Sequence, residues 1–223
     1  MSLEYPHIPQ QLLHYRSQKL QEAFTRQGEV NTWSAIDELF QIVSEITQMQ
    51  PVDLLPCLGF DPNNRDRDSL QSLFGVMRTV VTLHNLGFVE ITPLPPKQDR
   101  KEADLLAKRQ DDLFAVEVFR ANEDQWRYPG YNLEEYIGRR FVKDKKAQLA
   151  ATISSYGCSK AIVVVVFDSE SKALLSKSEF QEAAELSFAA MGFPDETHLI
   201  MFTGKSDALT GDDDLAIFPE LLS

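Results

Sequence analysis

Cysteine is scarce in this chain, and no apolar run is long. The sequence has 2 cysteines among 223 residues, Cys57 and Cys158, which lie far apart and have no CxxC pair. A disulfide scaffold or a structural zinc site is therefore not expected. The longest apolar run, residues 161–167, is far shorter than the roughly 20 residues that cross a bilayer. We expect no membrane association.

The first ten residues do not show the basic segment followed by an apolar segment that is typical of a secretory signal. Together with the few cysteines, this predicts a soluble protein of the cytoplasm. Positive charge is limited as well, with 22 Lys and Arg against 34 Asp and Glu and a net charge of −12. This charge argues against a protein that coats nucleic acid through its overall positive charge.

The middle of the chain has a different charge balance. Residues 68–168 carry 14 basic and 14 acidic side chains and so have no net charge. Within this region a short segment is basic, with Asp144 its one acidic residue, and contains Arg139, Arg140, Lys143, Lys145 and Lys146. An anionic ligand is expected here.

Hydrophobic spacing divides the chain into two regions. Helical periods run through residues 10–27 and again through residues 33–46, the second with Asn31 as its expected N-cap and Pro51 as its expected end. The segment 59–68 is rich in turn formers and charges, which predicts a boundary near residue 67. We therefore expect a helical extension and linker over residues 1–67 and an α/β domain over residues 68–223.

The second region alternates between strand and helix signals. The expected order is a helix at 70–85, a strand at 88–94, a hairpin of strands 103–107 and 113–119 joined by residues 108–112, a helix at 132–155, a strand at 161–167, a helix at 178–191 and a strand at 198–202. The acidic tail is expected to be irregular. This order predicts an α/β fold, a mixed sheet with helices on both faces.

Two acidic residues are predicted on the hairpin, Asp104 on its first strand and Glu117 on its second. Glu117 lies between Val116 and Val118, where an unpaired carboxylate is costly if that face is dry. Two carboxylates on facing strands supply the oxygen ligands that Mg²⁺ takes in proteins. The alternative is a hairpin with one wet face, on which Glu117 pairs with a nearby basic side chain.

The order of elements, together with Asp104, Glu117 and the sequence KDKKAQL at residues 143–149, resembles the PD-(D/E)XK nuclease superfamily. The resemblance covers roughly residues 69–203. It implies a restriction-endonuclease-like fold in which Asp104 and Glu117 bind Mg²⁺ or Mn²⁺. It also implies hydrolysis of phosphodiester bonds in DNA or RNA.

The sequence departs from the family pattern at Phe119, which stands where the motif lysine is expected. Either the lysine role has moved, most plausibly to Lys145 and otherwise to Lys143 or Lys108, or activity is lost. Gln148 lies one helical turn after Lys145 and completes the expected catalytic set of Asp104, Glu117, Lys145 and Gln148. The residues expected to hold nucleic-acid phosphates are Arg139, Arg140, Lys143 and Lys146.

Two alternatives to a nuclease stay open. The chain can be a catalytically inactive nuclease-like module that binds nucleic acid through its basic helix or binds a protein partner. The leading helices also have apolar faces. If these faces do not cover the sheet, they can pair between two copies in a homodimer.

Overall fold

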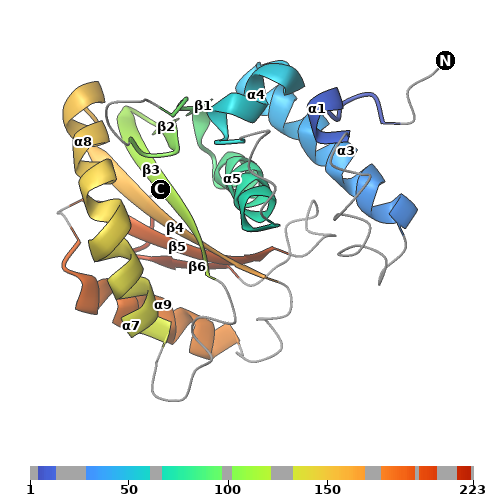
Figure 1. The fold of residues 1–223 in the computed structure, drawn as a ribbon. Helices are drawn as coiled ribbons and strands as arrows, with labels where there is room; N and C mark the ends of the chain where they lie inside the picture. The colour runs from blue at the N-terminus through green and yellow to red at the C-terminus, as the bar shows by residue number, and fades with distance from the viewer. Residues whose placement is uncertain are drawn as a thin grey trace.

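The fold is built on a six-stranded mixed sheet (Figure 1). The computed structural model describes residues 5–13, 29–60, 67–96, 102–121, 133–168, 177–193, 196–204 and 215–221. The strands lie in chain order, β1 (Val89–Pro93), β2 (Leu105–Arg109), β3 (Asp112–Ala121), β4 (Lys160–Asp168), β5 (Thr197–Gly204) and β6 (Leu215–Phe218). Strands β1 to β3 form an antiparallel meander, β3 to β5 are parallel, and β6 is antiparallel to β5. The predicted α/β class with a mixed sheet is confirmed.

Helices cover both faces of this sheet (Figure 1). One face carries α1 (Gln10–Leu13), α3 (Glu29–Thr47), α4 (Pro51–Cys57) and α5 (Arg67–Asn85). The other carries α7 (Leu133–Arg140), the π-helix η2 (Phe141–Lys145), α8 (Lys146–Tyr156) and α9 (Lys177–Met191). None of the helices in the described ranges has the length and apolar character needed to cross a membrane.

Strand β3 shows how the sequence divides the core into two layers. Successive side chains of a strand point to opposite faces. Val116 and Val118 are therefore buried in the layer under α3 and α5, whereas Ala115 and Phe119 are buried in the layer under α7 to α9. The neighbouring β4 is buried on both faces, which explains its uninterrupted apolar run.

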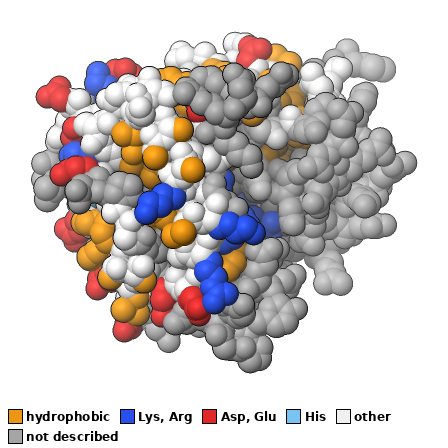
Figure 2. All heavy atoms as spheres, turned by 60° about the vertical axis from the view of Figure 1, so that its left-hand side comes forward, with side chains coloured by type: hydrophobic (Ala, Val, Ile, Leu, Met, Phe, Trp, Pro, Cys, Tyr) orange, Lys and Arg blue, Asp and Glu red, His pale blue; other side chains and the backbone are white. Residues whose placement is uncertain are grey.

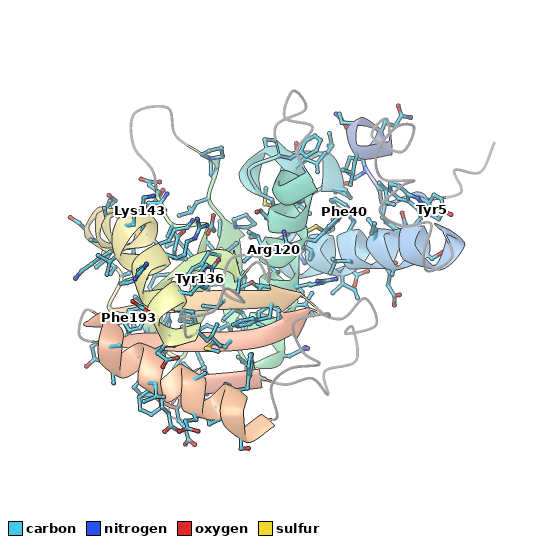
Figure 3. All side chains as sticks on the ribbon, turned by 60° about the horizontal axis from the view of Figure 1, so that its bottom comes forward. Tyr5, Phe40, Arg120, Tyr136, Lys143 and Phe193 are labelled. Carbon is cyan, nitrogen blue, oxygen red and sulfur yellow. The ribbon has the colours of Figure 1, made fainter. Side chains whose placement is uncertain are left out.

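The N-terminal helices share a core with the sheet. Their side chains Leu12, Trp33, Phe40 and Leu54 are buried in the same hydrophobic cluster as the α5 side of the sheet. Figure 3 shows Phe40 on this helical side of the molecule, with Tyr5 farther out. In the described residues, the apolar faces of these helices pack against the sheet, and the homodimer stays a prediction. The domain boundary near residue 67 stays a prediction.

The N-terminal helices differ from expectation in their ends. Asn31 lies inside α3, which begins at Glu29 and so is not capped by Asn31. Helix α3 ends at Thr47 because Gln48 adopts a left-handed backbone conformation, with φ of 57°. Pro51 is the first residue of α4, where its missing N–H is not needed. Of the helix expected over residues 10–27, the stretch from residue 14 lies outside the described residues.

Three further expectations are corrected. Strand β2 begins at Leu105 and ends at Arg109, two residues later than expected at each end. The turn of the hairpin is therefore shorter than expected and contains Gln110 and Asp111 alone. The tail is not wholly irregular, because Leu215–Phe218 pairs with the edge of β5 as β6. The long helix expected over residues 132–155 is interrupted by η2.

Candidate active site

The hairpin register brings Asp104 and Glu117 together. Leu105 pairs with Val116 across β2 and β3, so the next position along places Asp104 opposite Glu117. Asp104 itself precedes β2 by one residue, which corrects its expected place within a strand. Its Oδ2 accepts a hydrogen bond of 2.8 Å from the backbone N–H of Val118. The side chain of Asp104 is thereby held against β3.

Lys145 completes an ion pair with Glu117. The Glu117 side chain is 0% exposed, and the Nζ of Lys145, whose side chain is 19% exposed, lies 2.5 Å from its Oε1. The Glu117 carboxylate also interacts with the Asp104 side chain, and no further partner of its two oxygens occurs among the described residues. The charge of Lys145 is therefore the main compensation for burying Glu117.

The three charged groups perturb one another. Burial raises the pKa of Glu117 well above its ordinary value, and the neighbouring Asp104 charge raises it further. Burial also raises the pKa of Asp104, although Lys145 and the Val118 N–H oppose the rise. For Lys145, burial favours the neutral amine, but the charges of Glu117 and Asp104 outweigh it and the pKa is raised. Lys145 therefore keeps its proton near neutral pH.

The π-helix η2 presents Lys145 to the carboxylates. Its wider turn is closed by a hydrogen bond from the Lys146 N–H to the Phe141 carbonyl. Such a turn contains one residue more than an α-helical path and therefore rotates the helix that follows by about 100°. Ile137 and Phe141 are buried in the core, and the turn sets which face of α8 points toward the sheet. Short π segments within α-helices are frequent at functional sites.

Gln148 lies beside this group on α8. It is half-buried, one turn after Lys145, while Lys146 and Ala147 between them are exposed. Its Oε1 is buried and accepts no hydrogen bond from any residue that the structure describes. A buried amide oxygen without a partner is uncommon in proteins, so this atom is available to a ligand at the site.

The residues expected to bind phosphates separate into two groups. Arg139, Lys143 and Lys146 are exposed, and Figure 2 shows Lys and Arg side chains gathered on the face that α7, η2 and α8 present. Arg139 also forms an ion pair of 2.6 Å with Glu135. Arg140 is half-buried, and its charge acts on Lys145, where it opposes the rise in pKa. Arg140 therefore lies close enough to Lys145 for its charge to act there.

The structure distinguishes among the candidates for the displaced lysine. Phe119 is 4% exposed and packs in the core under α7 to α9. Lys108 forms an ion pair of 3.3 Å with Glu90 near the turn of the hairpin, and Lys143 is exposed. Among these three lysines, Lys145 is the one in contact with the acidic pair.

Sequence reasoning missed two residues of α8 that hold the segment before Asp104. The buried hydroxyl of Thr152 accepts a hydrogen bond of 2.7 Å from the Ala103 N–H. The Tyr156 hydroxyl donates a hydrogen bond of 3.1 Å to Glu102 Oε2. The signal was available, because Gln148, Thr152 and Tyr156 follow one another every four residues on one helix face.

The donor set fits a hard divalent ion that keeps some of its water. Asp104 and Glu117 lie close enough to perturb each other's pKa, and the Glu117 side chain is fully buried. Mg²⁺ is commonly bound by one or two carboxylates, with water and phosphate oxygens as its other ligands. No group of three or more His, Cys, Asp or Glu side chains suited to a metal occurs in the described ranges of the chain.

Comparison with protein-family models, with curated proteins and with solved structures finds no match to this chain. The chemistry of the site is therefore inferred from its own residues. These are two adjacent carboxylates, a protonated lysine in contact with one of them, and a buried amide oxygen without a partner among the described residues.

Proposed function

We propose that the protein is a Mg²⁺- or Mn²⁺-dependent nuclease that hydrolyses phosphodiester bonds in DNA or RNA. The observation that carries the proposal is the contact of Lys145 with Glu117 beside Asp104. Such a group offers carboxylate oxygens to a metal ion and a fixed positive charge to the phosphate within one small volume. In this proposal Lys145 takes the role of the motif lysine, because Phe119, the residue at the motif position, carries no charge.

The order of elements supports a restriction-endonuclease-like fold. Helix α5 precedes the meander β1 to β3, and α7, η2 and α8 then connect β3 to the parallel strand β4. This is the order on which the resemblance to the PD-(D/E)XK nucleases rests. In the proposed fold, both carboxylates come from the β2–β3 hairpin and the lysine comes from the connection to β4.

In the proposed mechanism, Asp104 and Glu117 hold the divalent ion. When bound, the ion lowers the pKa of a water molecule and polarises the phosphodiester. Lys145 keeps its proton, so it acts as a hydrogen-bond donor rather than as a general base. Its ammonium group orients the attacking water and stabilises the negative charge that grows on the phosphate oxygens in the transition state.

Gln148 and the basic residues position the substrate in this proposal. The buried Oε1 of Gln148 accepts a hydrogen bond from the attacking water. The exposed charges of Arg139, Lys143 and Lys146 hold the nucleic-acid backbone without reading its sequence. These three residues form the basic ridge of α7, η2 and α8.

The direct test is a cleavage assay on single- and double-stranded DNA and RNA, with Mg²⁺, Mn²⁺ or a chelator. Cleavage is expected with either metal ion and not with the chelator. Asp104→Ala is expected to abolish it, whereas Asp111→Ala, at the exposed turn of the same hairpin, should leave it unchanged. Cleavage that survives in Asp104→Ala would contradict the proposal.

The basic ridge by itself favours a second function, the binding of nucleic acid without cleavage. If the wild-type protein binds nucleic acid but cuts none of these substrates in either metal ion, the nuclease proposal fails. The chain is then a nuclease-like module that binds nucleic acid. Binding to either nucleic acid is measured in the same samples with the chelator present.

A further inference from the structure

Thr152 joins the helix that follows Lys145 to the strand segment that carries Asp104. Its side chain is 0% exposed. The hydroxyl accepts a hydrogen bond of 2.7 Å from the Ala103 N–H and donates one of 3.0 Å to the Gln148 carbonyl. One oxygen thus connects the residue before Asp104 with the turn of α8 that begins next to Lys145.

Asp104 needs such a connection because it lies outside the β2 ladder. The first ladder pair of β2 with β3 is Leu105 with Val116. The main chain at Asp104 is held by a hydrogen bond of 2.9 Å from the Leu94 N–H to the Asp104 carbonyl. On the other side of Asp104, two bonds tie the chain to α8, from the Tyr156 hydroxyl to the Glu102 side chain and, at the residue next to Asp104, from the Ala103 N–H to Thr152.

We propose that Thr152 is a positioning residue that sets the distance between Asp104 and Lys145. This inference rests on the proposed function, in which Asp104 holds the divalent ion and Lys145 faces it. Through its two hydrogen bonds, the Thr152 hydroxyl locks the segment before Asp104 to α8. Without the hydroxyl, the Asp104 carboxylate moves relative to the ammonium group of Lys145.

The structure offers a matched control on the opposite face of the sheet. Thr79 in α5 is also 0% exposed, and its hydroxyl donates a hydrogen bond of 2.9 Å to the Gly75 carbonyl four residues earlier. Thr79→Val and Thr152→Val remove the same buried group from a helix. Of the two hydroxyls, the one of Thr152 also binds the segment that carries Asp104.

The test compares wild type with Thr152→Val, Thr152→Ser and Thr79→Val after each is shown to be folded. Mn²⁺ affinity is measured by calorimetry and kcat by cleavage. Thr152→Val is expected to weaken Mn²⁺ binding by about tenfold, the lower end for loss of a group that orients a metal ligand. Thr152→Ser should restore wild-type affinity, and Thr79→Val should lower the Tm without changing affinity or kcat. If Thr152→Val does not fold, Thr152→Ala replaces it.

A second readout needs neither metal nor substrate. The Val118 amide donates to Asp104 Oδ2, so its NMR shift and hydrogen exchange report the position of Asp104. Both should change in Thr152→Val and stay unchanged in Thr152→Ser and Thr79→Val. An unchanged Val118 amide or wild-type Mn²⁺ affinity in Thr152→Val would overturn the positioning role. Absence of Mn²⁺ binding in the wild type, with the Val118 amide responding, would instead overturn the proposed function.

Discussion

The two faces of the sheet differ in what they bury. The face under α3 and α5 is apolar on the sheet side, where β3 contributes Val116 and Val118. The opposite face buries Glu117 from the same strand, paired with Lys145 and adjacent to Asp104. Figure 3 shows this division, with Phe40 on the first side and Tyr136 and Lys143 on the second.

The comparison separates stability from chemistry. Burying apolar side chains stabilises a fold by about 25 cal/mol per Å², and the α5 face does this with no fully buried charged side chain among the described residues. Burying ions costs free energy unless they are well paired. Strongly perturbed ionisable groups are typical of functional sites. We therefore infer that the α5 face holds the fold together and that the α8 face carries the chemistry.

The largest expected effect distinguishes two adjacent residues of β3, Val116 and Glu117, whose side chains point to opposite faces of the sheet. Glu117→Ala should abolish Mn²⁺-dependent cleavage because it removes a metal ligand. Val116→Ala should lower the free energy of unfolding by about 2 kcal/mol, the cost of two buried carbons and a small cavity, and should keep the activity. Denaturant unfolding and cleavage assays on both variants measure this. Equal losses of activity in the two folded variants would remove the distinction between the faces.

The next effect separates two adjacent lysines. Lys145→Met should lower kcat by about 100-fold or more, because a preorganised donor to the transition state is lost. Lys146→Met changes an exposed residue of the ridge and should leave kcat near the wild-type value. Mn²⁺ affinity, measured in parallel, should persist in both variants since neither lysine is a ligand. A Lys145→Met variant with wild-type kcat would show that the lysine role lies elsewhere.

A smaller effect is expected on nucleic-acid binding. The double change Lys143→Glu with Lys146→Glu reverses two exposed charges and should weaken binding about tenfold or more. It should also reduce the dependence of the affinity on salt concentration, because fewer counterions are released. Fluorescence anisotropy at several salt concentrations, with chelator present, measures both. If the double variant binds nucleic acid with wild-type affinity, the basic ridge is not the binding surface.

The smallest effect concerns the pH dependence of stability. The pKa of Glu117 is raised on folding, so its contribution to stability is present below the unfolded pKa and is lost as the pH rises through the folded pKa. Glu117→Gln keeps a neutral side chain at every pH. As the pH rises above the ordinary glutamate pKa of about 4.3, the metal-free wild type should lose more stability than Glu117→Gln. Urea unfolding in chelator at several pH values tests this, and parallel curves would contradict it.

Much of the fold could be predicted from the sequence, because local patterns control it. The apolar run of β4 and the apolar run of β3, which Glu117 alone interrupts between Leu113 and Phe119, predict strands from their own residues. The π-helix at residues 141–145 could not be predicted, since the residue types of this segment do not distinguish it from a regular α-helix. Strand β6 depends on pairing with β5 rather than on its own four residues.

The candidate site was predictable in its residues but not in its geometry. Asp104, Glu117 and Lys145 stand out by residue type, yet their proximity depends on the hairpin register. A shift of one residue would have turned Glu117 to the other face. The sequence places Thr152 on one helix face with Gln148 and Tyr156, but its partner could not be read from the sequence, because Ala103 is distant in the chain and donates a backbone group.

The central claim is that Asp104 and Glu117 form a divalent-metal site next to Lys145. A titration of the protein with Mn²⁺ by calorimetry, on wild type and Glu117→Gln, tests it most directly. Glu117→Gln preserves the size of the side chain and removes its charge. The account predicts one Mn²⁺ per wild-type chain and no measurable binding to Glu117→Gln. Equal binding to both proteins, or no binding to the wild type, would contradict it.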